Sequence, residues 1–231
     1  MAARPLFALI SMILVAGAIV LTFFVLLAGA INDNPVNKFY FLSADTSDIT
    51  GAPAESRWTF WNVCGTTSNG RNDCGKVHPA YPFNPPSNFG TKTNVPQQFI
   101  GTKEYYYLTR FMFAFDLIYL FFAVCSLAVG LLALCTRIGS YLAGLFAMIA
   151  AFFSVLTAAL MTAAYVKGRN NFISNDQTAH LGNAVSLADV LEAQEAGAAS
   201  LMRTERNLPS VYEPEHSIPV GWKNDSLKSS K

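Results

Sequence analysis

Three long apolar runs alternate with polar segments along this chain. The runs extend over Leu6–Ile31, Phe111–Leu134 and Ile138–Val166. About 20 consecutive apolar residues are enough for a helix to cross the hydrocarbon core of a bilayer. The pattern therefore predicts an α-helical membrane protein with a first span in residues 1–31, a second in 110–135, and a hairpin and third span in 136–166.

The first run has a second interpretation. Residues Ala28–Ala30 resemble the small-residue cleavage site that ends a secretory signal peptide. However, the apolar core of a signal peptide has about 7 to 15 residues, and Leu6–Ile31 is longer. We therefore interpret this run as a retained membrane span.

The polar segment between the first two spans, residues 32–109, shows strand-like patterns. Aromatic and β-branched residues gather in Lys38–Leu42, Trp58–Val63 and Tyr105–Tyr107, and such stretches predict strands. The prolines between Pro79 and Pro96 exclude a regular interior strand and predict an ordered loop. We expect a small β-rich loop on one side of the membrane.

Two of the four cysteines lie in this segment. Cys64 and Cys74 flank a stretch rich in glycine, asparagine and serine, so the chain between them can turn and bring the thiols together. A disulfide would stabilise the fold by about 3 kcal/mol in the entropic treatment and would place the loop on the oxidising, extracytoplasmic side. The alternatives are free thiols in a cytosolic loop, or a metal site with His78 as the one further ligand nearby.

The disulfide also orients the chain. With residues 32–109 outside, the N-terminus and residues 135–140 lie in the cytosol, where Arg4 and Arg137 agree with the positive-inside tendency. Lys167 then falls on the outer side and weakens that agreement. We give the disulfide argument priority over the charge count.

Composition supports a membrane protein and excludes several functions. Hydrophobic residues make up 52% of the chain and charged residues 13%, about half the charged share of a soluble domain. A net charge of +1 gives no basic surface for nucleic acid. Ser68, Asp73 and His78 lie near one another in the sequence without forming a recognisable catalytic pattern, so we expect no enzyme, cofactor, metal or small-molecule substrate.

One acid, Asp116, interrupts the second span. A carboxylate there costs about 1–3 kcal/mol unless it is paired, protonated or hydrated. Arg110 lies on a different helical face, so Lys167 and the hydroxyls of Thr162 and Tyr165 are the expected partners. Asp116 is either an ion or proton site or a structural carboxyl. We favour the structural role, because a lone acid makes no pathway.

The hairpin and third span carry two further features. Cys135 beside Arg137 at the membrane edge is a candidate for palmitoylation, or an unmodified cysteine. Alanines recur every four residues at Ala143, Ala147 and Ala151 and again at Ala159 and Ala163. Such spacing lets helices approach closely in lipid, and we expect it to serve packing within the bundle rather than an interface between copies of the chain.

After the third span, residues 167–231 form a polar tail. Apolar positions near 187–202 recur with helical period opposite several acids, which predicts a short amphipathic helix. Those acids make a fourth crossing costly, so we expect the tail to stay on the outer side. Asn224 begins the chain's one N-glycosylation acceptor sequence and is a candidate for modification there.

Several sequence blocks resemble a known family. The block Arg57–Gly65, RWTFWNVCG, places Trp58 and Trp61 before Cys64, and this pattern is similar to the first extracellular loop of claudin-type proteins. Together with Pro79–Pro85, Asn88–Gly90, Gly130–Tyr141 and Leu160–Asn170, it resembles the fungal Sur-seven/PalI family over about residues 1–182. The resemblance implies a claudin-like bundle. The family's fourth span would follow Gly182, where this chain carries acids instead.

The resemblance also implies a function. Members of this family organise stable, eisosome-associated patches of the plasma membrane at the cell cortex and support lipid organisation, endocytosis and cell-wall integrity. The expected partners are membrane lipids, together with lateral self-association or related membrane proteins. The alternative is an accessory protein of ambient-pH signalling, as in the PalI branch. A transporter is disfavoured because the spans lack broken helices and internal repeats.

Overall fold

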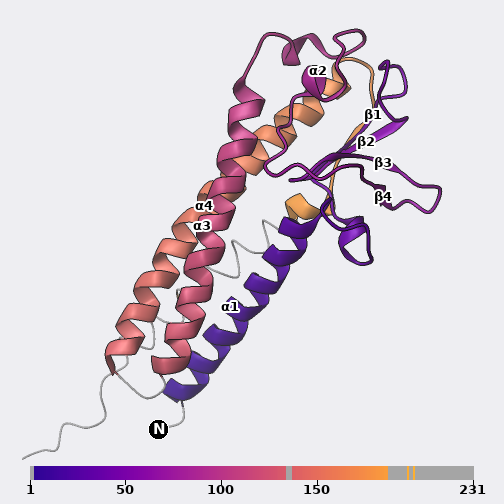
Figure 1. Ribbon diagram of the computed structural model, residues 1–231. Helices are drawn as coiled ribbons and strands as arrows, with labels where there is room; N and C mark the ends of the chain where they lie inside the picture. Colours follow the sequence, from indigo (N-terminus) through magenta and orange to yellow (C-terminus); the bar gives the residue numbers. More distant parts are fainter. Residues whose placement is uncertain (1–2, 134–136, 187–196, 198–199, 201–231) are drawn as a thin grey trace, which may run out of the picture.

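The computed structural model describes residues 3–133 and 137–186, together with residues 197 and 200. Three long helices dominate it: α1 (Ala3–Leu27), α3 (Glu104–Ala133) and α4 (Arg137–Ile173). These are the helices in the described part of the chain that are long and apolar enough to cross a membrane. α3 and α4 lie side by side, whereas α1 separates from them toward the strands (Figure 1). The three predicted spans are thereby confirmed.

A five-stranded antiparallel sheet lies at the end of the helices opposite the N-terminus (Figure 1). Its strands are β1 (Leu42–Asp45), β2 (Glu55–Trp58), β3 (Val63–Thr66), β4 (Asn72–Asp73) and β5 (Ala179–Leu181), in the order β4-β3-β2-β1-β5. β5 follows α4 in the chain and pairs with β1. Residues 179–181 therefore lie on the same side of the membrane as the loop between the first two spans.

The predicted strands need correction. Tyr105–Tyr107 belongs to α3, which starts where the N–H of Glu104 donates a hydrogen bond to Thr102 Oγ1 at 3.1 Å. Trp58–Val63 covers the turn between β2 and β3, with a strand residue only at each end. In both stretches, the surrounding structure overrides the strand preference of aromatic residues.

The remaining loop is ordered around short helices. The predicted strand Lys38–Leu42 begins in the 3-10 turn η1 (Val36–Lys38), and only Leu42 joins β1. The proline-rich segment contains α2 (Pro85–Asn88), and η2 (Gln97–Phe99) follows it. The expectation of an ordered loop without an interior strand is confirmed.

α3 and α4 are longer than a membrane requires. They contain 30 and 37 residues, which correspond to about 45 and 55 Å at 1.5 Å per residue. The hydrocarbon core is about 30 Å thick. The helix ends beside the sheet therefore project beyond the hydrocarbon and are available to support the sheet.

Aromatic side chains join the inner face of the sheet to these helix ends. Ring pairs in this region include Phe41–Tyr165 at 5.0 Å, Trp58–Phe83 at 5.2 Å and Phe99–Phe172 at 5.1 Å between centroids. All six residues are nearly fully buried. Such pairs stabilise by about 0.5–1.5 kcal/mol each beyond the burial of their area. The sheet and the projecting helix ends thus share one core.

Gly168 sets the distance between α4 and the proline-rich loop. A methyl group added at Gly168 would lie 2.5 Å from Phe83 Cε1 and 2.7 Å from Phe83 Cζ, well inside contact distance. Because glycine has no side chain, the Phe83 ring can lie directly against the α4 backbone.

Inside the membrane segment, α1 packs on the other two helices. Val15 and Ile19 of α1 cluster with Tyr119 and Ala123 of α3 and with Ala150 of α4. This packing gives α1 a place in the helix bundle, which supports a retained span over a cleaved signal peptide.

The alanine repeat of α4 is only partly used for packing. Ala143 and Ala147 are buried, and Ser126 Oγ donates a hydrogen bond to the carbonyl of Ala143 at 3.1 Å. Ala159 and Ala163 are exposed, so their predicted packing role is wrong. A four-residue repeat drifts by about 40° per step around a 3.6-residue helix, and it therefore leaves the interface along α4.

Candidate functional site: the disulfide-closed sheet

Side chains of the sheet alternate between an inner and an outer face. In β1, Leu42 and Ala44 face the helices, while Ser43 and Asp45 lie on the opposite face. The outer face is polar and includes exposed residues such as Asp45 and His180 beside the buried Ser43, whereas the inner face belongs to the core. We therefore take the outer face, with the contacts that hold it in place, as the candidate functional site.

Trp58 anchors the inner face. Its ring packs against Phe83, Phe89 and Phe172, and its indole N–H donates a hydrogen bond to Asn88 Oδ1 at 3.2 Å. Asn88 Nδ2 donates in turn to the carbonyl of Pro82 at 3.1 Å. Trp58 thus attaches the proline-rich loop to the sheet.

Trp61 connects the β2–β3 turn to the membrane helices. Its indole N–H donates a hydrogen bond to the carbonyl of Leu26 in α1, and its ring lies edge-on to Phe113 of α3 at 5.7 Å. Within the turn, the N–H of Asn62 donates to Thr59 Oγ1 at 3.1 Å. The turn is therefore closed locally and joined to two spans.

Cys64 and Cys74 form the expected disulfide, with their Cα atoms 4.3 Å apart. Cys64 is fully buried in β3, and Cys74 directly follows β4. Asn32 Nδ2 donates to the carbonyl of Cys74 at 3.3 Å, which connects the bridge to the segment leaving α1. Gly65 lies against Pro53, where a methyl group would meet the proline ring at 3.4 Å. Because the sulfurs are bonded to each other, neither cysteine acts as a metal ligand.

Sequence analysis missed the role of Arg57. Its Nε donates to Glu55 Oε1 at 3.0 Å, its Nη1 donates to the Gly70 carbonyl at 2.9 Å and to Asn72 Oδ1 at 3.2 Å, and its guanidinium lies 4.5 Å from the Tyr40 ring centroid. Arg57 also lies opposite Cys64 in the β2–β3 register. One side chain therefore holds the disulfide hairpin on β2. The one signal of this role in the sequence was a single basic residue, Arg57, next to the aromatic motif that begins at Trp58.

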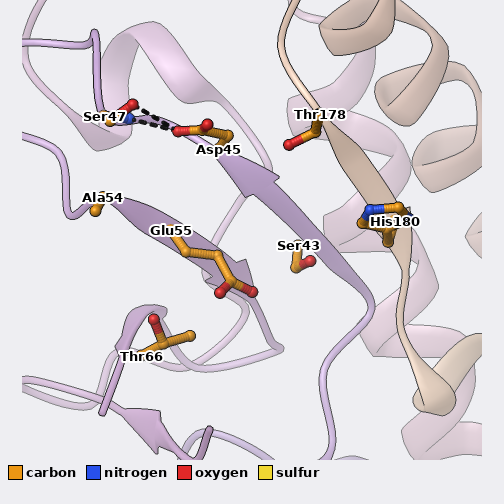
Figure 2. A pocket seen from close by; sticks show the side chains of 8 residues that line it. All are labelled: Ser43, Asp45, Ser47, Ala54, Glu55, Thr66, Thr178 and His180. Atoms are coloured by element: carbon orange, nitrogen blue, oxygen red, sulfur yellow. Dashed lines mark hydrogen bonds between the residues drawn. The ribbon is translucent and has the colours of Figure 1, made fainter. Parts of the chain in front are cut away.

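A polar groove crosses the outer face of the sheet (Figure 2). It encloses about 530 Å³ and is lined by Ser43, Asp45, Ser47, Ala54, Glu55, Thr66, Thr178 and His180. Asp45 and Glu55 lie directly opposite each other across β1 and β2, and Figure 2 shows His180 on the neighbouring strand β5. The groove therefore presents hydroxyl, carboxylate and imidazole groups on the surface of the sheet.

Both carboxylates of the groove already have partners. The hydroxyl and N–H of Ser47 donate to Asp45 Oδ1 at 2.7 and 3.0 Å, and they hold the pKa of Asp45 below its usual value. Glu55 is paired with Arg57. These contacts offset the repulsion between the two negative charges, which face each other across the two strands. Across residues 3–133 and 137–186, no group of three or more His, Cys, Asp or Glu is placed to hold a metal.

Asp116 does not have the predicted partners. It is 5% exposed, and its Oδ2 has no hydrogen-bond partner in the described part of the chain. Thr162 is exposed, Tyr165 belongs to the aromatic core, and Lys167 binds Glu104.

The helix register explains this correction. Phe115 and Phe153 meet at 5.7 Å between centroids, which puts Asp116 near the level of Phe153. Lys167 lies almost four turns farther toward the sheet, or about 20 Å at 1.5 Å per residue. A lysine side chain cannot reach that far.

Three predicted features stay predictions. Cys135 and Asn224 lie outside the residues that the structure describes, and the amphipathic helix near 187–202 is described only at residues 197 and 200.

Comparison with known proteins identifies relatives. A sequence model of the SUR7/PalI family matches residues 7–187. Protein SUR7 of Candida albicans is 38% identical over 181 residues, which cover 78% of this chain and 66% of that protein. Protein SUR7 of Saccharomyces cerevisiae is 35% identical over 176 residues, covering 75% and 58%. A protein of the same yeast described as "Uncharacterized plasma membrane protein YNL194C" is 36% identical over 177 residues, covering 75% and 59%.

The match to this chain therefore spans between 58% and 66% of the length of these three relatives. The range matched by the family model, residues 7–187, includes most of α1, all of α3 and α4, the disulfide and the whole sheet. The resemblance found in the sequence blocks is confirmed, as is a claudin-like fold with a disulfide-bonded, β-rich loop. The chain belongs to the SUR7/PalI family and is a SUR7-type membrane protein.

Proposed function

We propose that this chain is a structural protein that organises patches of a fungal plasma membrane, and that it is not an enzyme. The observation that carries the proposal is the rigid connection between the outer face and the spans. The Cys64–Cys74 bridge, the Arg57 contacts and the aromatic core fix one polar surface relative to three membrane helices. A protein built in this way presents the same contact surface to each neighbour in the membrane, which is what a protein that organises membrane patches requires.

The proposed site of action is the cell cortex, in stable eisosome-associated patches. There the protein would support lipid organisation, endocytosis and cell-wall integrity. Its SUR7-named fungal relatives, and the plasma-membrane description of one further relative, support this proposal. Membrane lipids and lateral association with copies of itself or related membrane proteins are the proposed partners.

Imaging of the full chain with a fluorescent tag at its N-terminus tests this function. Static cortical patches that do not recover after photobleaching are the expected result. Diffuse or endosome-linked signal would contradict it and would favour an accessory role in ambient-pH signalling. Cys64→Ser/Cys74→Ser should weaken patch formation, whereas Cys125→Ser, which removes a free thiol in α3, should leave the patches unchanged.

A further inference from the structure

Arg110 occupies an unusual position on α3. The face of α3 that packs on α4 carries Thr109, Met112, Asp116 and Tyr119, all nearly fully buried. The opposite, exposed stripe runs through Tyr107, Arg110, Ala114, Leu117 and Phe121. In a membrane this stripe faces lipid, so Arg110 projects from the lipid-facing side of its helix.

The length of α3 fixes the depth of Arg110. About 20 residues of helix cross the hydrocarbon core. Counted from Ala133, the last residue of α3, they reach Ala114. Arg110 lies one turn beyond, at the boundary between hydrocarbon and headgroups in the leaflet next to the sheet. Tyr107, one turn away, is of a residue type enriched at this boundary, and the neighbouring Phe111 is 55% exposed, as a lipid-facing residue should be.

Arg110 has no acidic partner within the chain as described. The two ion pairs there are Arg57–Glu55 and Lys167–Glu104. The guanidinium of Arg110 instead lies 4.7 Å from the centroid of the Tyr106 ring. Stacking on an aromatic ring leaves the edge N–H groups of a guanidinium free, and these match the oxygens of a phosphate.

We propose that Arg110, held by Tyr106, binds the phosphate of a phospholipid headgroup in the extracytoplasmic leaflet. The site would give a protein that organises membrane patches a specific contact with the lipid around it. It rests on the orientation of α3 and not on the patch function, so it stands even if the proposed function fails.

Native mass spectrometry of the full chain in detergent tests the site, with dioleoyl phosphatidic acid as the probe. Dioleoylglycerol has the same acyl chains without phosphate and serves as the matched lipid. We expect phosphatidic acid to bind and Arg110→Gln to weaken it about fivefold, which corresponds to the roughly 1 kcal/mol of one base near an anionic membrane. Arg110→Lys should bind at an intermediate level, and Tyr106→Leu should also weaken binding, because it removes the ring under the guanidinium.

Lys92→Gln is the charge-matched control, because Lys92 is an exposed base in the loop between α2 and η2. An equal loss of lipid binding in Lys92→Gln and Arg110→Gln would show that only net charge matters and would overturn the site.

Equal binding of dioleoylglycerol would overturn phosphate recognition. Displacement of the lipid by millimolar inorganic phosphate would overturn the lipid as ligand. If Arg110→Gln changes the oligomer mass and leaves lipid binding intact, the partner is a second copy and the proposal is wrong. Recovery of the intact disulfide by non-reducing mass analysis shows that each variant has folded.

Discussion

Lys167 Nζ donates hydrogen bonds to both carboxylate oxygens of Glu104, at 2.7 and 2.8 Å. The pair joins α4 to α3 at the helix ends beside the sheet, and about half of each side chain is exposed. Exposed ion pairs contribute about 0–1 kcal/mol, so its effect on stability is small. Its geometry nevertheless shows that the base expected to neutralise Asp116 is already bound elsewhere.

Double-mutant cycles should show that Lys167 is coupled to Glu104 and not to Asp116. Lys167→Gln and Glu104→Gln should show a coupling below about 1 kcal/mol that decreases as salt is raised. Lys167→Gln and Asp116→Asn should instead be additive within about 0.5 kcal/mol, because the two groups are far apart. Thermal unfolding in detergent, followed by circular dichroism, measures both. A larger coupling between Lys167 and Asp116 would contradict the register of α3 and α4.

Asp116→Asn should leave the free energy of unfolding unchanged or raise it slightly. The amide keeps the shape and hydrogen-bonding capacity of the side chain and removes a charge that costs about 1–3 kcal/mol at this depth in the span. Unfolding and cortical imaging of the variant check this. Loss of patches at normal expression would revive the ion-site hypothesis for Asp116.

Gly168→Ala should destabilise the protein by about 1 kcal/mol. Overpacking against Phe83 costs about 1–3 kcal/mol, and the better helix propensity of alanine recovers at most about 1 kcal/mol. Gly130→Ala is the matched control in α3, because the added methyl group would meet only Met12 Cγ, at 3.9 Å. That variant should be neutral or stabilised. Equal melting temperatures for the two variants would show that Phe83 moves away without cost.

The sequence predicted the spans and the cysteine pair because each depends on local pattern. An uncharged run such as Leu6–Ile31 has few stable environments other than a bilayer, and Cys64 and Cys74 are close enough in sequence to meet. β5 could not be predicted this way. Ala179–Leu181 is only three residues long and becomes a strand because β1, far away in the sequence, offers its edge.

The partners of charged side chains also depended on tertiary structure. Lys167 and Asp116 appeared close when each was placed only by its distance from a span end, whereas the register of α3 on α4 separates them. Arg57 looked like one base in an aromatic motif. Its partners, Gly70 and Asn72, approach it only when the disulfide hairpin folds back over β2.

Arg57→Lys should loosen the hairpin without unfolding the sheet. Lysine keeps the charge but cannot donate to Glu55, Gly70 and Asn72 from one planar group, and the loss of such contacts costs about 1–2 kcal/mol. Hydrogen exchange should therefore accelerate at residues 67–73. Arg71→Lys, at an exposed position in the same turn, should leave exchange unchanged. Equal protection in Arg57→Lys and the wild type would exclude a clamping role.

Replacement of both bridge cysteines, Cys64→Ser/Cys74→Ser, should lower the free energy of unfolding by about 3 kcal/mol. The bridge closes a loop with a sequence separation of 10, and the estimate follows from the entropy that such a closure removes from the unfolded chain. Thermal unfolding in detergent measures the loss. Cys125→Ser should show no comparable effect, because Cys125 is free.

The single variant Cys64→Ser should be affected more than the double variant, because it leaves the Cys74 thiol free to form wrong disulfides in an oxidising compartment. We expect it to be retained in the secretory pathway, while part of the double variant reaches the cell surface. Mass spectrometry of non-reduced wild-type peptides should show Cys64 and Cys74 linked. Alkylation of both thiols in the mature protein would contradict the bridge, and normal surface delivery of Cys64→Ser would show that folding does not require it.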